Sequence, residues 1–307
     1  MKQPPSGYPS QPALPSTVPI EMSQIMLPDD TNPMGNVHGG TILKLIEKAG
    51  FIVSCRHCNI SSNGDEGDVV KEPLTTVLVR LEHMDFHQPM YVGEVAQLQA
   101  AVTYTSPNSI EVTVDVWAEN VITNQRRHTN TATLWYVAIP ASVTKAASIG
   151  DMRKLIQPVP QVQGLSEKEL QEGRKRYEAQ KLSRAAQKDN GSQRLAICHS
   201  PHDAEDHTVL ASQSTLANIV LPSDCTVTGH LTGGSLMKTM DSAAGICAVR
   251  HCHSRVVTAS IDEINFYEPI TNGEMVFVTA RTVYTSAKSM EIEVCYAISF
   301  VEILVDF

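Results

Sequence analysis

The sequence predicts an α+β protein built from two copies of one module, each an antiparallel sheet wrapped around a long central helix. Two observations carry this prediction. Segments of the first half of the chain recur in the second half at a nearly constant spacing. In each copy, a long apolar segment with helical periodicity precedes runs of alternating apolar and polar residues, which is typical of a helix followed by consecutive strands. Such elements pack as one sheet around one helix.

The duplication is centred on a pair of glycines. Around this pair the matching residues lie 194 positions apart, and beyond Cys58 they lie 180 positions apart. The matched segments are Gly35–Lys44 with Gly229–Lys238, Arg56–Cys58 with Arg250–Cys252, and Tyr104–Ser106 with Tyr284–Ser286. The first copy therefore contains 14 additional residues, which we expect in the polar loop 61–68.

Each copy begins with a helix that follows its glycine pair. In the first copy, apolar residues cover most of the helix circumference from Ile42 to Val53, which indicates a helix buried on nearly all sides. Alternation then predicts four strands, at Thr76–Leu81, Glu94–Tyr104, Ser109–Glu119 and Thr129–Ile139.

Composition limits the classes of partner and site. The net charge of −9, without a basic stripe, argues against a nucleic acid as the partner. No apolar run reaches the ~20 residues of a membrane-spanning helix, so we expect no membrane insertion. Seven cysteines, an odd number, indicate free thiols in a reducing compartment. The pair Cys55 and Cys58 lacks a second ligand pair at zinc-site spacing, so we expect no metal site.

The chain is expected to divide into four regions. Residues 1–21 are rich in Pro and Ser and lack the features of a secretory or transit peptide, so we expect a disordered tail. Residues 22–140 form the first copy and residues 213–307 the second. Residues 141–212 form a linker, in which Ser166 and Glu169 make a capping-box start for a charged helix.

The motifs of both copies resemble the cytosolic acyl-CoA hydrolases, whose two domains have the hotdog fold. The resemblance spans about residues 22 to 295 and rests on Asp29–Gly40, Pro222–Asp224, Met290–Val294 and the linker segment Glu172–Lys181. It implies hydrolysis of long-chain fatty acyl-CoA thioesters in the cytosol, with coenzyme A as part of the substrate and no cofactor. It also implies one continuous surface formed by the two sheets, a pocket between the copies, and a trimer of such chains.

The resemblance implies a catalytic pair made of Asn32 from the first copy and Asp241 from the second. Asp241 would act as general base or as nucleophile, and Asn32 would orient the water or the thioester carbonyl. Independently of the resemblance, a carboxylate inside an otherwise apolar helix marks Asp241 as unusual. Gly233 and Gly234 precede this helix, and we expect their backbone N–H groups to bind the oxyanion, since the first N–H groups of a helix have no partner within it.

The matching positions of the other copy supply secondary candidates. Glu47 matches Asp241 and Thr226 matches Asn32, so a second pocket could combine Glu47 with Thr226. Asn32 follows two aspartates and precedes a proline, so a role in a turn is its simpler alternative.

His38 is a further secondary candidate. It could serve as a general base for hydration of an enoyl thioester, as in hotdog dehydratases. Its counterpart in the second copy is Thr232, however, and a structural hydrogen bond is the simpler role.

The second copy is expected to be incomplete. At the spacing of 180 residues, Phe307 matches Arg127, so the second copy has no counterpart of the strand predicted at Thr129–Ile139. A missing strand would expose a sheet edge. This leaves an alternative function open, that of a non-catalytic acyl-CoA binder or subunit partner.

Overall fold

The computed structural model describes residues 19–59, 72–142, 154–189, 208–267 and 269–299. The predicted loop 61–68 and nearly all of the predicted tail lie outside these residues. The first strand begins at Ile20, so the tail predicted over residues 1–21 extends two residues too far, because the alternating segment that starts there pairs with a strand of the first sheet.

The described part of the first copy contains one long helix and six strands. Its elements are β1 (Ile20–Ile25), α1 (Gly39–Cys58), β2 (Leu74–Leu81), β3 (Met84–Asp85), β4 (Val95–Thr105), β5 (Ile110–Asn120) and β6 (Gln125–Pro140). A short 3-10 helix, η1 (Pro28–Asp30), precedes α1. The four predicted strands correspond to β2, β4, β5 and β6, and the predicted helix is α1.

The linker and the second copy follow in the same order. Their described elements are α3 (Glu167–Asp189), α4 (Val209–Ser212), β7 (Ser214–Ile219), η2 (Pro222–Asp224), α5 (Gly233–Cys252), β8 (Ser260–Ile261), β9 (Ile264–Asn265), β10 (Met275–Thr285) and β11 (Met290–Ser299). The expected counterpart of β6 is absent from the described part of the second copy, in which β11 is the last strand.

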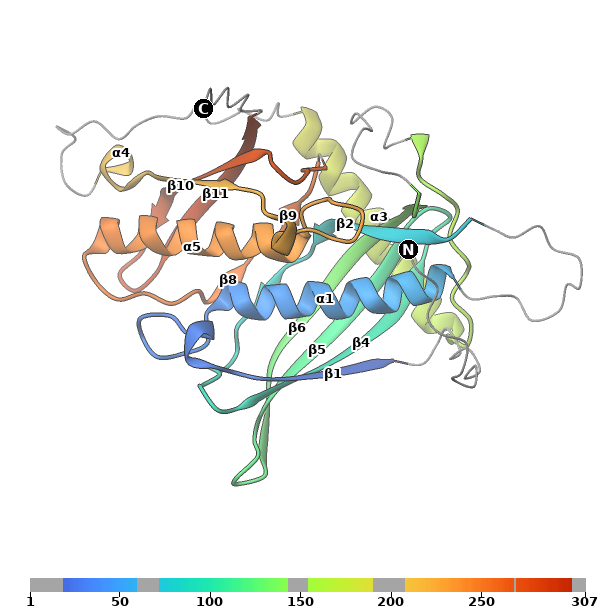
Figure 1. Cartoon of the computed structure of the whole chain (residues 1–307), viewed down its shortest axis with the longest axis horizontal. Coiled ribbons are helices and arrows are strands. Elements are labelled where there is room, and N and C mark those ends of the chain that lie inside the picture. Colours follow the sequence, from blue (N-terminus) through green and yellow to red (C-terminus); the bar gives the residue numbers. More distant parts are fainter. Residues whose placement is uncertain (1–18, 60–71, 143–153, 190–207, 268, 300–307) are drawn as a thin grey trace, which may run out of the picture.

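The larger sheet wraps around α1 and also takes in a strand of the second copy. Its order is β1-β4-β5-β6-β2-β9, with antiparallel pairing throughout. β7, β10 and β11 form a second sheet against α5, and β3 pairs with β8 (Figure 1). The fold class predicted from the sequence, two α+β modules with a sheet around a helix, is therefore confirmed.

Alternation along the strands creates the core. On β5, every second side chain is fully buried: Ile110, Val112, Val114, Val116 and Ala118. They face the apolar side chains of α1, including Leu43 and Ile46, which are also fully buried. Burial of such side chains stabilises the module by about 1.5–3 kcal/mol each.

The linker helix α3 is anchored to the outer face of the first sheet. Its start has the predicted capping box, since Ser166 and Glu169 bond to each other through side chains and backbone N–H groups. The guanidinium of Arg176 makes two hydrogen bonds of 2.7 Å to the fully buried carboxylate of Glu111 on β5. Gly173 lies against the ring of Tyr104, where a Cβ atom would come within 2.4 Å. Although its exposed face is highly charged, α3 is thus fastened to the sheet by one buried carboxylate.

Helices α1 and α5 lie side by side and cross at their N-terminal halves (Figure 1). A Cβ atom at Gly40 would lie 2.7 Å from the Cα of Lys238, and one at Gly234 would lie 2.9 Å from the Cα of Lys44. The second glycine of each pair therefore permits the close approach of the two helix backbones. The crossing is antiparallel, so the N-terminus of each helix lies against the third turn of the other.

Candidate active site

The N-terminus of α1 lies against a carboxylate of α5. Asp241 is buried, and its Oδ2 accepts a hydrogen bond of 2.7 Å from the backbone N–H of Gly40. The Nδ1 atom of His38, the N-cap residue of α1, lies 3.1 Å from the same oxygen. A helix N-terminus favours a nearby negative charge, because its first N–H groups lack partners within the helix.

The other oxygen of this carboxylate is held by a threonine. The hydroxyl of Thr258, in the segment before β8, donates a hydrogen bond of 2.6 Å to Oδ1 of Asp241. Both oxygens of Asp241 are therefore bonded, one to the first copy and one to its own copy. This fixes the plane of the carboxylate, which a general base or nucleophile needs if it is to meet its target in one orientation.

A large open groove reaches this carboxylate. Its lining includes Asn32, His38, Gly39, Asp241 and Thr258. The structure thus places both members of the predicted catalytic pair on one groove, which lies between the two copies.

Asn32 also makes a turn. Its Oδ1 accepts hydrogen bonds from the backbone N–H groups of Met34, at 2.9 Å, and Asn36, at 3.3 Å. The contacts of Asn32 are therefore those of a turn residue, as the simpler alternative expected. These bonds hold the amide in place at the rim of the groove, so the turn role and a role in orienting substrate are compatible.

The second glycine pair, Gly233 and Gly234, lies beside Glu47 and not beside Asp241. Gly233 and Gly234 lead directly into the helix that carries Asp241, yet the backbone N–H of Gly234 bonds to Glu47 of α1. A Cβ atom at Gly233 would meet the side chain of Leu78, at 2.6 Å. These glycines were expected to bind the oxyanion near Asp241, but they lie beside Glu47, because in the antiparallel crossing each helix N-terminus lies against the carboxylate of the opposite helix. The glycines next to Asp241 are Gly39 and Gly40.

The site around Glu47 differs chemically from the site around Asp241. Burial raises the pKa of Glu47 to about 7, although nearby Lys48 and Lys44 and the N–H of Gly234 lower it by smaller amounts. The hydroxyl of Thr226 lies 2.8 Å from that of Thr228, within its own turn. A pKa near neutral pH does not by itself exclude a general base. The two sites differ instead in their access, since Asp241 lines the groove and Glu47 does not.

The sequence repeat explains this difference at one position. At the spacing of 180 residues, Thr258 matches Leu78. Thr258 donates a hydrogen bond to Asp241, whereas the side chain of Leu78 packs on Gly233. Sequence reasoning missed Thr258, although the exchange of a hydroxyl for an apolar side chain between matching positions was a visible signal.

His38 caps α1 and contacts the candidate base. Its Nδ1 lies 3.0 Å from the N–H of Gly40 and 3.1 Å from Asp241. The structural role expected for His38 is therefore present. Its counterpart Thr232 caps α5 in the same way, through a hydrogen bond of 3.2 Å from the N–H of Ser235.

The described residues hold no group of three or more His, Cys, Asp or Glu side chains placed to bind a metal ion. Within the same part of the chain, none of the helices is both long enough and apolar enough to cross a membrane.

Comparison with known proteins identifies the family. A family model described as the thioesterase superfamily matches residues 34–123 and 228–296, one segment in each copy. The cytosolic acyl coenzyme A thioester hydrolase of Rattus norvegicus is 47% identical over 275 residues, which is 90% of this chain and 67% of that protein. The Homo sapiens protein of the same name is 48% identical over 272 residues, which is 88% of this chain and 66% of that protein. The chain thus spans about two thirds of these relatives.

One solved structure shows the same fold over most of the chain. A 12:0-ACP thioesterase from Umbellularia californica covers 91% of this chain and 88% of its own, with a TM-score of 0.53 and 9% identity. A hexameric acyl-CoA thioesterase in its apo form covers 57% of this chain and 94% of its own, with a TM-score of 0.41 and 26% identity. Given the duplicated helix-and-sheet module and the extent of sequence identity, the chain belongs to the thioesterase superfamily and, within it, to the family of cytosolic acyl-CoA thioester hydrolases.

Proposed function

We propose that this protein hydrolyses long-chain fatty acyl-CoA thioesters to a free fatty acid and coenzyme A, in the cytosol and without a cofactor. The observation that carries the proposal is the buried carboxylate of Asp241, fixed through both oxygens and reached by an open groove between the two copies. The relatives that are nearly half identical to the chain are named cytosolic acyl coenzyme A thioester hydrolases, without a chain length.

In this proposal, Asp241 acts on the water that attacks the thioester. The carboxylate accepts the proton of the water as the oxygen bonds to the thioester carbon, and the sulfur of coenzyme A leaves as that carbon re-forms its carbonyl. If Asp241 instead attacked the carbon directly, a mixed anhydride would form and water would then hydrolyse it. Asn32, on the same groove, orients the water or the carbonyl.

The developing negative charge on the thioester oxygen needs donors. We assign these to the N-terminus of α1 at Gly39, which lines the groove, in place of Gly233 and Gly234, which adjoin Glu47. One preorganised donor of this kind lowers the barrier by about 3 kcal/mol. Gly40 has a different task, since its N–H holds Asp241.

A single working site follows from the asymmetry of the two carboxylates. Glu47 does not line the groove, and the position that matches the donor Thr258 is Leu78, which has no hydroxyl. Asp241 has a hydroxyl, an N–H group and an imidazole nitrogen within hydrogen-bonding distance. We therefore place the reaction at Asp241 alone.

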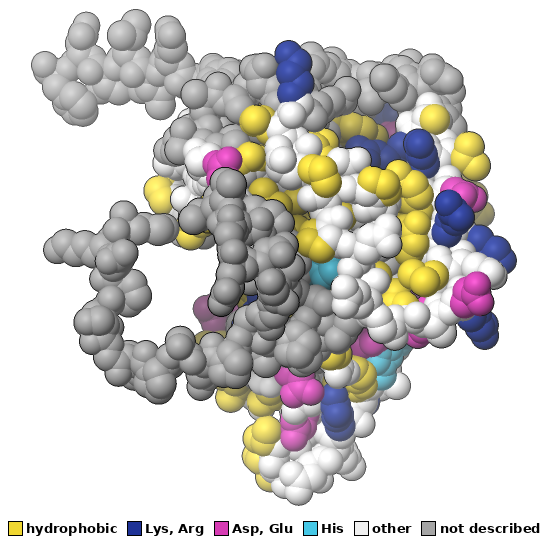
Figure 2. Space-filling model, turned by 90° about the vertical axis from the view of Figure 1, so that its right-hand side faces the viewer, with side chains coloured by type: hydrophobic (Ala, Val, Ile, Leu, Met, Phe, Trp, Pro, Cys, Tyr) yellow, Lys and Arg dark blue, Asp and Glu magenta, His cyan; other side chains and the backbone are white. Residues whose placement is uncertain are grey.

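Self-association forms part of the proposal, with a trimer as the assembly. Hydrophobic side chains reach the surface among charged ones, as Figure 2 shows for one face. Four exposed hydrophobic residues occupy matching positions of the two copies. Ile25 and Leu27 in the first copy match Ile219 and Leu221 in the second, and each side chain is about half exposed. Duplicated exposed apolar residues favour a contact that both copies make in the same way. Sedimentation equilibrium of the purified chain gives the mass that decides between monomer and trimer.

The test of the activity is release of coenzyme A from palmitoyl-CoA, followed with a thiol reagent. We expect turnover by the unchanged protein and loss of at least a hundredfold in Asp241→Ala, an order-of-magnitude figure for removing a catalytic group. Glu47→Gln is the matched control, because it alters the equivalent carboxylate of the other helix. Equal rates for the unchanged protein and Asp241→Ala would overturn the proposal.

A further inference from the structure

The two copies are joined along one backbone seam. We define the seam as residues 79–86 of the first copy with residues 259–266 of the second. Paired positions along it are Arg80 with Asn265, Leu81 with Ile264, Met84 with Ile261, and Asp85 with Ser260. Backbone hydrogen bonds close both ends, from Phe266 N–H to Val79 at 3.1 Å and from Phe86 N–H to Ala259 at 2.9 Å.

One end of the seam lies at the candidate active site. Thr258, which donates to Asp241, immediately precedes it on the second copy. On the first copy it ends at Phe86, whose ring lies 3.3 Å from where a Cβ atom of Gly39 would be. The register of the seam therefore sets where Thr258 lies relative to Asp241.

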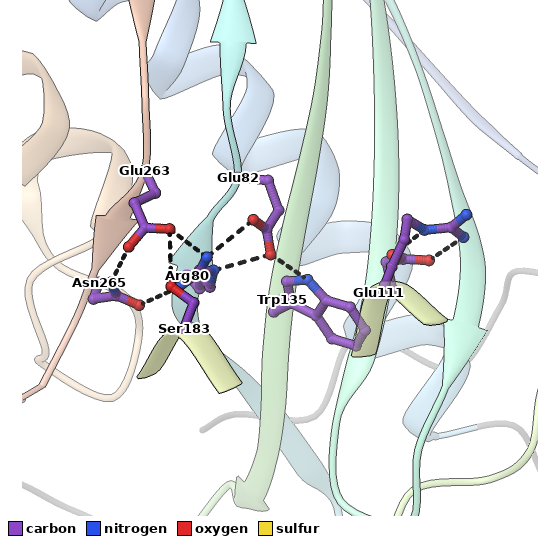
Figure 3. A network of polar contacts seen from close by, with 8 residues as sticks. Arg80, Glu82, Glu111, Trp135, Ser183, Glu263 and Asn265 are labelled. Carbon is purple, nitrogen blue, oxygen red and sulfur yellow. Dashed lines mark hydrogen bonds and ion pairs between the residues drawn. The ribbon is translucent and has the colours of Figure 1, made fainter. Parts of the chain in front are cut away.

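The other end of the seam holds a buried arginine (Figure 3). The side chain of Arg80 is only 3% exposed. Within its own copy it bonds to Glu82, at 2.9 and 3.2 Å. Across the seam it bonds to the carboxylate of Glu263 and to Oδ1 of Asn265, the latter at 3.1 Å. Figure 3 shows these groups converging on the guanidinium, with Ser183 of the linker helix also reaching Glu263 at 3.4 Å.

A buried guanidinium selects one register. A slip of one residue along a strand turns every side chain to the opposite face. Such a slip would carry Glu263 and Asn265 away from Arg80 and leave its charge incompletely paired in the interior, which is strongly unfavourable. The backbone pairs of the seam are few, so they specify the register weakly without the ion pair.

We propose that Arg80 is a positioning residue for the reaction, acting through Glu263 and Asn265. It pins the register of the seam and thereby holds Thr258 against Asp241. This inference rests on the proposed thioesterase function, because it assigns a role at that same site. Arg80 itself lies too far along the seam to be a catalytic residue: it pairs with Asn265, which is seven positions beyond Thr258.

Glu263→Ala and Glu82→Ala form a matched pair for the test. Each removes one carboxylate from Arg80, but only Glu263 is across the seam. Glu82→Ala is the more demanding control, since it also removes the acceptor of the Trp135 indole N–H. We expect kcat for palmitoyl-CoA to fall about tenfold or more in Glu263→Ala with KM changed little, since small misplacements of a reacting group are costly. Glu82→Ala should keep kcat within about twofold of the unchanged protein, and Glu263→Gln, which retains an acceptor, should recover most of the lost kcat.

A double-mutant cycle separates positioning from general destabilisation. In a Thr258→Val background, Glu263→Ala should lower kcat no further, because the contact through which it acts is already gone. Independent effects that multiply would overturn the proposal, as would equal losses of kcat in Glu263→Ala and Glu82→Ala.

A readout without substrate keeps this inference separate from the activity. Amide hydrogen exchange over residues 258–266 should accelerate in Glu263→Ala and stay unchanged in Glu82→Ala, because only the first variant loosens the seam. Unchanged exchange in Glu263→Ala would overturn the register role even if the enzyme were active. Absence of coenzyme A release by the unchanged protein would overturn the proposed function and leave the exchange result standing.

Discussion

The hydroxyl of Thr258 donates a hydrogen bond of 2.6 Å to Asp241, and the opposite oxygen of that carboxylate is held by the other copy of the module. Thr258→Val keeps the shape of the side chain and removes the donor. We expect kcat for acyl-CoA hydrolysis to fall roughly tenfold to a hundredfold, since a hydrogen bond to a charged group is worth about 1.5–3 kcal/mol. Steady-state kinetics measure this, and Thr258→Ser, which restores the hydroxyl, is the control. Full activity of Thr258→Val would show that the contact is dispensable.

The buried carboxyl of Glu47 makes stability depend on pH. Its folded-state pKa is raised from 4.5 to about 7, so between these values the folded protein keeps a proton that the unfolded chain has lost. Stability therefore falls as pH rises through this window and levels off above it. Glu47→Gln removes this pH dependence. Between pH 4 and pH 8 the unchanged protein should therefore lose on the order of 3 kcal/mol of unfolding free energy relative to the variant.

Thermal unfolding of both proteins across this pH range measures the change. The difference between their Tm values should widen from pH 4.5 to 7 and then stay constant. A difference that is the same at every pH would contradict the shift of the Glu47 pKa.

The glycines at the helix crossing are expected to resist substitution. A Cβ atom at Gly40 would come within 2.7 Å of the Lys238 backbone, so Gly40→Ala must separate α1 from α5 and should destabilise the protein by about 1–3 kcal/mol. Separating the helices also lengthens the hydrogen bond from the backbone N–H of residue 40 to Asp241, so activity should fall as well. Gly245→Ala is the control: that glycine faces open space within α5, so alanine there should stabilise by up to about 1 kcal/mol. Urea unfolding compares the two, and equal stabilities would rule out a tight crossing.

The linker helix should depend on a single arginine. Arg176→Ala leaves the carboxylate of Glu111, which is fully buried, without its charged partner. We expect a loss of about 3 kcal/mol in the free energy of unfolding. Arg174→Ala, on the same helix, removes only an exposed contact of 3.9 Å to Glu178 and should change stability by less than about 0.5 kcal/mol. Similar losses in both variants would mean that Glu111 does not anchor the helix.

Much of the fold was predictable because it repeats local patterns. The helical periodicity after Gly39–Gly40 gave α1, and alternation located β2, β4 and β5 to within two residues. Strand β6 begins at Gln125, four residues before the predicted start, because its first residues are polar and pair with the end of β5 in the hairpin.

The short strands β3, β8 and β9 were not predicted. Each has only two residues, too few for alternation to be visible, and each exists because it pairs with the other copy.

In the candidate site, too, the residues with a local sequence signal were predictable and their long-range partners were not. Asp241 stood out from the sequence because a carboxylate interrupts an apolar helix, and the matching position of Glu47 followed from the repeat. The partners of these carboxylates could not be predicted, since they depend on how the helices cross. Gly40 bonds to a residue 201 positions away, and no local pattern distinguishes this from a contact between Gly234 and Asp241, which is seven residues further along the same helix. For the same reason the sequence could not show that Gly233 and Gly234 lie beside Glu47 and not beside Asp241.

The crossing of α1 and α5 also bears on how such a protein can change over time. Each helix supplies its N-terminus to the carboxylate of the other, so neither module holds a whole site by itself. In an association of two identical modules, any substitution would enter both sites at once. Covalent duplication removes that coupling: a leucine at position 78 and a threonine at position 258 could arise separately, one in each half. The tandem arrangement thus permits the two carboxylate sites to acquire different partners, as Asp241 and Glu47 have done.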